Sequence, residues 1–203
     1  MKQYIEELKI IFIHVPKTGG SYVEKNMLAF AKEIDSKYTA MGGHTPYKFY
    51  LNEQKFENYT AFAVVRHPYD KMISTFNHYK NPQSHQFERY VAMGKPNTIE
   101  LFVEKIKNEM NENHPFFATQ YDWLNFEGRL PIIVKYEYFK QGAEYLATLC
   151  NNPELNRLFK KLSDGHHPNI YNIKSELNPQ TIKTINNLYH KDFEYFRYDK
   201  LEI

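Results

Sequence analysis

The sequence contains one cysteine, Cys150, and has no apolar run long enough to cross a membrane. A single cysteine excludes an intrachain disulfide framework and a cysteine-based zinc site. The longest apolar run near the amino terminus is Ile10–Ile13, far below the ~20 residues that span a bilayer. Residues 1–9 carry charges among their apolar residues and lack the apolar stretch of a signal peptide. We therefore expect a protein without a membrane segment, located in the cytoplasm.

An excess of one charge is also lacking, because 26 Lys and Arg residues balance 24 Asp and Glu residues. The basic residues are dispersed, which argues against nucleic acid as a partner and means that any anion site must be local. The chain has no evident repeat and no Gly/Ser-rich or Pro-rich linker. With 42% hydrophobic and 16% aromatic residues among 203, the composition predicts one folded domain over residues 1–203.

Hydrophobic periodicity predicts an α/β fold with a central, mainly parallel sheet flanked by helices. Short β-branched runs favour buried strands, and apolar stripes at helical spacing favour helices between them. Ser21 is a candidate helix cap, Asn97 opens a capping-box pattern, and Tyr79–Asn97 reads as a mobile loop. The strands are expected at residues 8–15, 37–41, 59–66 and 130–135, and the helices at residues 21–34, 69–78, 97–107, 139–150, 152–161 and 178–190.

The segment His14-Val-Pro-Lys-Thr-Gly-Gly-Ser21 lies between an expected strand and an expected helix. A glycine-bearing turn presents backbone N–H groups, and the helix amino terminus adds positive potential, so the segment is a candidate anion cradle. Lys17 would add a full charge. An ordinary strand-to-helix turn that happens to contain Lys and Gly is the alternative.

The cradle is not a Walker A loop, because that motif places glycine before the lysine and Ser or Thr directly after it. The strand ending at Arg66 also differs from a Walker B strand, which ends in an Asp that holds magnesium. A guanidinium there suits direct binding of a second phosphate, and Ser74 follows about two helical turns later. Alternatively, Arg66 is a surface ion-pairing group.

Lys17-Thr-Gly-Gly-Ser21 together with Val64-Val-Arg66-His-Pro-Tyr-Asp-Lys-Met-Ile-Ser74 resembles the sulfotransferases that use 3′-phosphoadenosine-5′-phosphosulfate (PAPS), closest to the carbohydrate 2-O-sulfotransferase branch. The resemblance implies a P-loop-like three-layer fold and transfer of a sulfuryl group to a hydroxyl, with PAP as product and no metal. It implies an acceptor such as a sugar, glycolipid or polysaccharide. It assigns the 3′-phosphate to Arg66 and Ser74, and the 5′-phosphosulfate to Lys17, Thr18, Gly19, Gly20 and Ser21.

For catalysis we predict Lys17 as the group that stabilises the leaving phosphate and His44 as the base. His44 follows a Gly-Gly turn beyond the second strand, where the resemblance places a catalytic His or Glu, and imidazole accepts a proton at neutral pH. A surface-loop histidine is the alternative. His14 is interpreted as structural. The roles of His67, His166 and His167 are left open.

Two other functions fit parts of the pattern. A P-loop kinase or other NTPase shares the strand–loop–helix start, although the Walker residues are missing. A non-catalytic module that binds PAP or another anion would keep Lys17 and Arg66 but need no base. The identity of the acceptor and the residues that contact adenine are not predicted.

Overall fold

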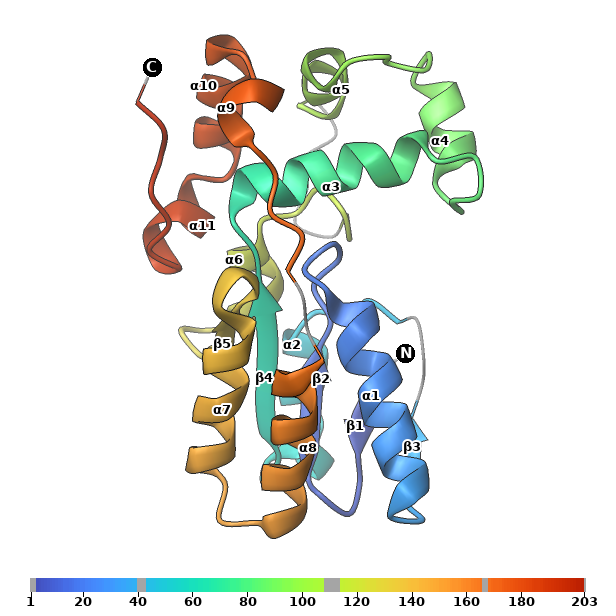
Figure 1. The fold of residues 1–203 in the computed structure, drawn as a ribbon, viewed down its shortest axis with the longest axis vertical. Helices are drawn as coiled ribbons and strands as arrows, with labels where there is room; N and C mark the ends of the chain where they lie inside the picture. Colours follow the sequence, from blue (N-terminus) through green and yellow to red (C-terminus); the bar gives the residue numbers. More distant parts are fainter. Residues whose placement is uncertain (1–2, 40–42, 108–113, 166–167, 203) are drawn as a thin grey trace. The chain divides into compact units, whose positions relative to one another are not determined.

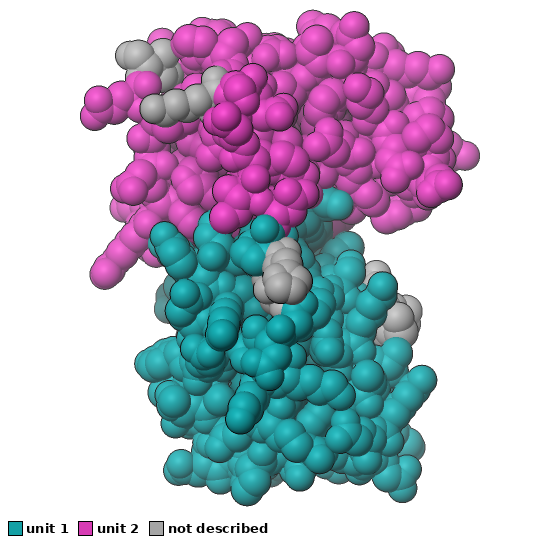
Figure 2. Space-filling view, in the orientation of Figure 1, with its two compact units in different colours: residues 1–65, 122–168 teal, residues 66–121, 169–203 magenta. Residues whose placement is uncertain are grey.

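The computed structural model describes residues 3–39, 43–107, 114–165 and 168–202, and the chain divides into two compact units. Unit 1 comprises residues 1–65 and 122–168, and unit 2 comprises residues 66–121 and 169–203 (Figure 2). Each unit therefore takes two separate stretches of the chain. That residues 1–203 act as a single domain stays a prediction.

Unit 1 contains a five-stranded sheet in the order β3-β1-β2-β4-β5 (Figure 1). The three strands β2, β4 and β5 are parallel, whereas β1 pairs antiparallel with both β2 and β3. Consequently β3 runs in the same direction as β2. The predicted α/β fold with a mainly parallel sheet is confirmed. The strands are β1 (Tyr4–Ile5), β2 (Ile10–Ile13), β3 (Tyr38–Thr39), β4 (Thr60–Val65) and β5 (Ile132–Lys135).

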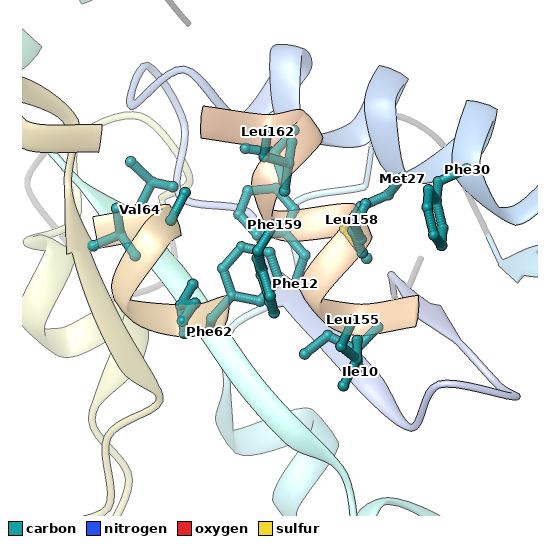
Figure 3. Close-up of a cluster of buried hydrophobic side chains, with 14 of the residues drawn as sticks. Ile10, Phe12, Met27, Phe30, Phe62, Val64, Leu155, Leu158, Phe159 and Leu162 are labelled. Atoms are coloured by element: carbon teal, nitrogen blue, oxygen red, sulfur yellow. The ribbon is translucent and has the colours of Figure 1, made fainter. Parts of the chain in front are cut away.

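Three helices, α1 (Gly20–Glu33), α7 (Phe139–Leu149) and α8 (Pro153–Asp164), pack on one face of this sheet. Figure 3 shows Phe12 and Phe62 of the strands clustered with Phe159 of α8. The next strand residues face the other way, and they are buried too, so both faces of the sheet are covered. These are Ile11, Ile13, Ala61, Ala63 and Val65. The shorter elements are α2 (Lys48–Leu51), η1 (Gln54–Phe56) and η2 (Tyr136–Tyr138).

Unit 2 is helical in its described residues, and α3 (Pro68–Lys80) contacts most of its other helices. Its interior is rich in aromatic side chains, among them the fully buried Tyr79, Phe102 and Phe117. Helix α6 (Gln120–Leu124) begins in unit 2 and ends in unit 1. The other helices are α4 (Phe87–Ala92), α5 (Ile99–Ile106), α9 (Ile173–Glu176), α10 (Pro179–Leu188) and α11 (His190–Tyr195).

Two predicted helix caps are wrong by one or two positions. Helix α1 begins at Gly20 and its N-cap residue is Gly19, which makes no side-chain cap, so Ser21 lies inside the first turn. Helix α5 is capped by Thr98, whose side chain accepts a hydrogen bond from the Leu101 backbone N–H. The cap is therefore Thr98 and not the predicted Asn97. Thr98 has the extended backbone that an N-cap residue requires.

Two further predictions are corrected by the structure. The stretch Tyr79–Asn97 contains helix α4, which is anchored by the buried Tyr90, whose hydroxyl donates to the Pro96 carbonyl. The predicted strand Lys37–Met41 covers only Tyr38–Thr39, and its residues 40 and 41 lie outside the described residues. Within the described ranges, no helix is both long and apolar enough to cross a membrane.

Candidate functional site

The loop between β2 and α1, the predicted anion cradle, makes a tight turn into the helix. Lys17 (φ 66°) and Gly19 (φ 85°) both adopt left-handed conformations, which reverse the chain sharply before the helix. The buried Thr18 hydroxyl donates to the Val15 carbonyl at 2.9 Å, which fixes the turn. Since that hydroxyl proton is used within the loop, a ligand contact through the Thr18 side chain stays a prediction.

The amino terminus of α1 keeps its positive potential. The first turn of the helix contains no acidic residue, and its N-cap residue, Gly19, makes no side-chain cap. The half-buried Lys17 side chain and the exposed Ser21 side chain stand just before and within this turn. Backbone N–H groups at a helix start, the helix dipole and a lysine charge all favour an anion, so binding of a phosphate or phosphosulfate group in this loop stays a prediction that the backbone is consistent with.

His44, the predicted base, lies in the same unit as the cradle and is linked to it by His14. The His14 and His44 rings meet edge to face, with their centroids 4.4 Å apart. His14 in turn packs against Gly20, where an added Cβ would lie 2.0 Å from His14 Cδ2. Because β3 runs parallel to β2, its carboxyl end lies at the same edge of the sheet as the carboxyl end of β2. The structure thus brings His44, His14 and the start of α1 together.

His14 also contacts the carboxylate of Glu24, a residue that was not predicted to belong to the site. Its Nδ1 atom lies 3.1 Å from Glu24 Oε1, and the two side chains are almost fully buried. Glu24 Oε1 accepts a second hydrogen bond from Gln3 Nε2. Helical spacing offered one signal for Glu24, because Gly20, Glu24 and Met27 share the buried face of α1.

Arg66, the first residue after β4, belongs to unit 2 and is held there through its backbone. Gln120 accepts from the Arg66 N–H and donates to the Arg66 carbonyl, both at 2.8 Å. Asp192 holds Gln120 by accepting from its backbone N–H at 3.0 Å and from its side-chain amide at 3.2 Å. This buried clamp is formed by residues far apart in sequence, and no local pattern indicated it.

The Arg66 guanidinium is fixed by the segment that follows residue 168. Its Nη2 donates to the Asn169 carbonyl, and its Cζ lies 5.4 Å from the centre of the Tyr171 ring. The Tyr171 N–H donates to Asp70 on α3 at 3.1 Å. Ser74, the other predicted 3′-phosphate residue, lies half-buried on α3. Arg66 is only four percent exposed and its backbone is held in place. Such a fixed guanidinium could bind a phosphate in one defined geometry.

Unit 2 also buries a lysine close to this clamp. Lys71 Nζ donates to the Phe116 carbonyl at 3.1 Å, and burial lowers the Lys71 pKa to about 8. Burial likewise raises the pKa of Asp192 above its ordinary value, although the hydrogen bonds from Gln120 and Tyr121 oppose that rise. Each of these groups is therefore more easily neutralised than it would be in water.

The other histidines have separate surroundings. His67 stacks on Tyr69 with a centroid distance of 5.1 Å. His166 and His167 lie outside the described residues. Among the residues that the structure describes, no group of three or more His, Cys, Asp or Glu side chains could hold a metal ion.

Comparison with known proteins identifies the class. The model of the sulfotransferase family matches residues 4–199, so the chain belongs to that family. Sulfuryl transfer to a hydroxyl-bearing acceptor is the family's reaction, and PAPS is the sulfate donor that membership implies. No curated protein and no solved structure matches the chain.

Proposed function

We propose that this protein transfers a sulfuryl group from PAPS to a hydroxyl of a carbohydrate or a related acceptor, in the cytoplasm. The observation that supports it best is the cradle of Lys17–Ser21 at the start of α1, with His44 held beside it through His14. The membership of the chain in the sulfotransferase family supports the reaction class. The similarity of the two phosphate motifs to the 2-O-sulfotransferase branch supports a sugar hydroxyl as the acceptor.

We assign each of these residues a role in binding or in catalysis. The N–H groups of Gly19, Gly20 and Ser21 bind the 5′-phosphosulfate, and Arg66 with Ser74 binds the 3′-phosphate. PAPS supplies the sulfuryl group, and the bond from sulfur to the bridging oxygen breaks as the acceptor oxygen bonds to sulfur. Lys17 stabilises the negative charge that develops on that bridging oxygen. His44 accepts the proton of the acceptor hydroxyl, so the products are PAP, the sulfated acceptor and a protonated imidazole.

Binding tests the nucleotide site without an acceptor. Titration calorimetry in EDTA is expected to show PAP binding more tightly than AMP, because only PAP carries the 3′-phosphate. Arg66→Ala should weaken PAP binding by roughly 1.5–3 kcal/mol, the usual contribution of a hydrogen bond to a charged group. Equal affinity for PAP and AMP would contradict the role of Arg66 and Ser74.

Turnover tests the catalytic roles, using radiolabelled PAPS with a set of hydroxylated sugars, glycolipids and polysaccharides. Lys17→Ala should reduce turnover far more than it weakens PAP binding, since its charge acts chiefly in the transition state. His44→Ala should reduce turnover by ~10²–10⁴-fold with PAP affinity nearly unchanged. A His44→Ala protein that keeps more than about a tenth of the activity would refute the assignment of the base.

A further inference from the structure

Glu24 is a buried carboxylate on the face of α1 that packs against the sheet. Its side chain is only seven percent exposed, and it lies among apolar residues on that face of the helix. Burying an ionised carboxylate is costly unless other groups satisfy it with hydrogen bonds. Its position therefore requires an explanation beyond packing, and its contacts supply one.

Glu24 reaches His44 by two separate routes. The first runs through the His14 ring, which lies 3.1 Å from Glu24 Oε1 at its Nδ1 and contacts the His44 ring at its edge. The second runs through Gln3, whose amide donates both to Glu24 Oε1 and to the Gly43 carbonyl, the latter at 2.7 Å. Gly43 directly precedes His44, so one carboxylate is connected to both the ring and the backbone of the predicted base.

The chemistry of these contacts fixes the orientation of His14. An ionised carboxylate only accepts hydrogen bonds, so a hydrogen bond between ionised Glu24 and His14 requires the hydrogen on His14 Nδ1. The opposite edge of the ring lies against Gly20, where a Cβ would come within 2.1 Å of Nε2. His14 also stacks on Phe12 with a centroid distance of 5.6 Å. The ring is therefore held on several sides and presents a fixed surface to His44.

We propose that Glu24 is a positioning residue, which acts through His14 and Gln3 to hold His44 at the head of α1. This inference rests on the proposed role of His44 as the base. A base contributes only when it lies within hydrogen-bond reach of the proton that it removes, and a misplacement of about 1 Å can cost ~10²-fold in rate. Glu24 touches neither nucleotide nor acceptor in this role.

Three variants at the start of α1 test the proposal. Glu24→Ala removes both hydrogen bonds and should lower kcat by about 10- to 100-fold, with PAP affinity unchanged within about twofold. Glu24→Gln keeps an oxygen that can accept from His14 and Gln3, so it should retain kcat within about threefold. Lys25→Ala, at the exposed neighbouring position, is the matched control and should behave as wild type.

A double-mutant cycle separates positioning from a general loss of structure. If Glu24 acts through His44, Glu24→Ala should have little further effect on kcat once His44 is already alanine. A purely structural role would instead lower kcat by the same factor in both backgrounds, and that result would overturn the proposal. Equal kcat for wild type and Glu24→Ala would overturn it as well.

A readout without turnover distinguishes this proposal from the proposed function. Proton–nitrogen NMR spectra of the histidine rings, assigned by the signals lost in His14→Asn and His44→Ala, should show a hydrogen on His14 Nδ1. The His44 signals should shift or broaden in Glu24→Ala and stay unchanged in Glu24→Gln. Unchanged His44 signals in Glu24→Ala would refute the positioning role. A wild-type chain that transfers sulfuryl groups to none of the acceptors would refute the proposed function, while these spectra would still decide whether Glu24 holds His44.

Discussion

The close packing of His14 on Gly20 makes Gly20→Ala a severe perturbation for a single methyl group. The added Cβ would lie 2.0 Å from His14 Cδ2 and 2.1 Å from Nε2, whereas carbon atoms in contact are normally about 3.5 Å apart or more. The ring must therefore retreat by more than 1 Å, according to this contact distance. It is five percent exposed and is bordered by Phe12 and His44, so it has little room to move.

Two opposing terms set the size of the effect. Overpacking a filled interior costs typically ~1–3 kcal/mol, and the size of this overlap favours the upper end. Alanine in place of glycine in a helix returns up to ~1 kcal/mol. We expect a net loss of about 2 kcal/mol in the free energy of unfolding, which corresponds to a fall of about 1 M in the urea midpoint for a typical slope.

Urea titrations of four proteins measure this value: wild type, Gly20→Ala, His14→Ala and the double variant. When His14 is already alanine, the methyl group at position 20 meets no ring, so Gly20→Ala should then be neutral or slightly stabilising. Gly20→Ala as stable as wild type, or equally costly in both backgrounds, would show that the ring contact is not the cause.

Three further predictions concern unit 2. Lys71 has a pKa of about 8 in the fold against 10.5 ordinarily, so between these pH values the unfolded chain binds one more proton than the folded chain. The free energy of unfolding should therefore rise with pH over this range, by up to about 3 kcal/mol. Chemical denaturation from about pH 7.5 to 10 should show the rise in wild type, and Lys71→Met should lack it. Gln120→Ala removes the hydrogen bonds that hold the Arg66 backbone, so it should reduce the preference for PAP over AMP by about tenfold in calorimetry. An unchanged preference in a folded variant would refute the idea that Gln120 positions Arg66 for the 3′-phosphate. Thr98→Ala should lose about 1 kcal/mol of stability and Asn97→Ala almost none, and the reverse order would contradict the cap seen at α5.

Sequence patterns were sufficient where a residue's surroundings are local. Runs such as Ile10–Ile13 and Thr60–Val65 show their burial in their own composition, and the turn Lys17–Gly20 shows its shape through its glycines. The two-residue strand β1 was missed because its length gives no detectable alternation. Placement of Asn97 as a cap failed because Thr98 offers the same chemistry one residue later, and only the backbone angles decide between them.

The supporting contacts of the site are set by tertiary structure and carry no local signature. Gln120 meets the Arg66 backbone across 54 positions of sequence, and Asp192 meets Gln120 across 72. Glu24 looks like an ordinary helical glutamate until His14 and Gln3 are placed against it. A single sequence predicts which groups carry charge, but the fold decides which groups hold them in place.

The division of each unit between two stretches of chain has a consequence for synthesis on the ribosome. All residues of unit 1 leave the ribosome ahead of residues 169–203, which complete unit 2. That last stretch supplies Asp192, which holds Gln120, and Tyr171, which packs on the Arg66 guanidinium. During vectorial synthesis the sheet and the Lys17 loop can therefore mature first. Helix α3 meanwhile lacks two of its aromatic contacts, since Phe193, which packs on Tyr69, and Tyr189, whose ring lies beside the buried Lys71, both belong to that last stretch.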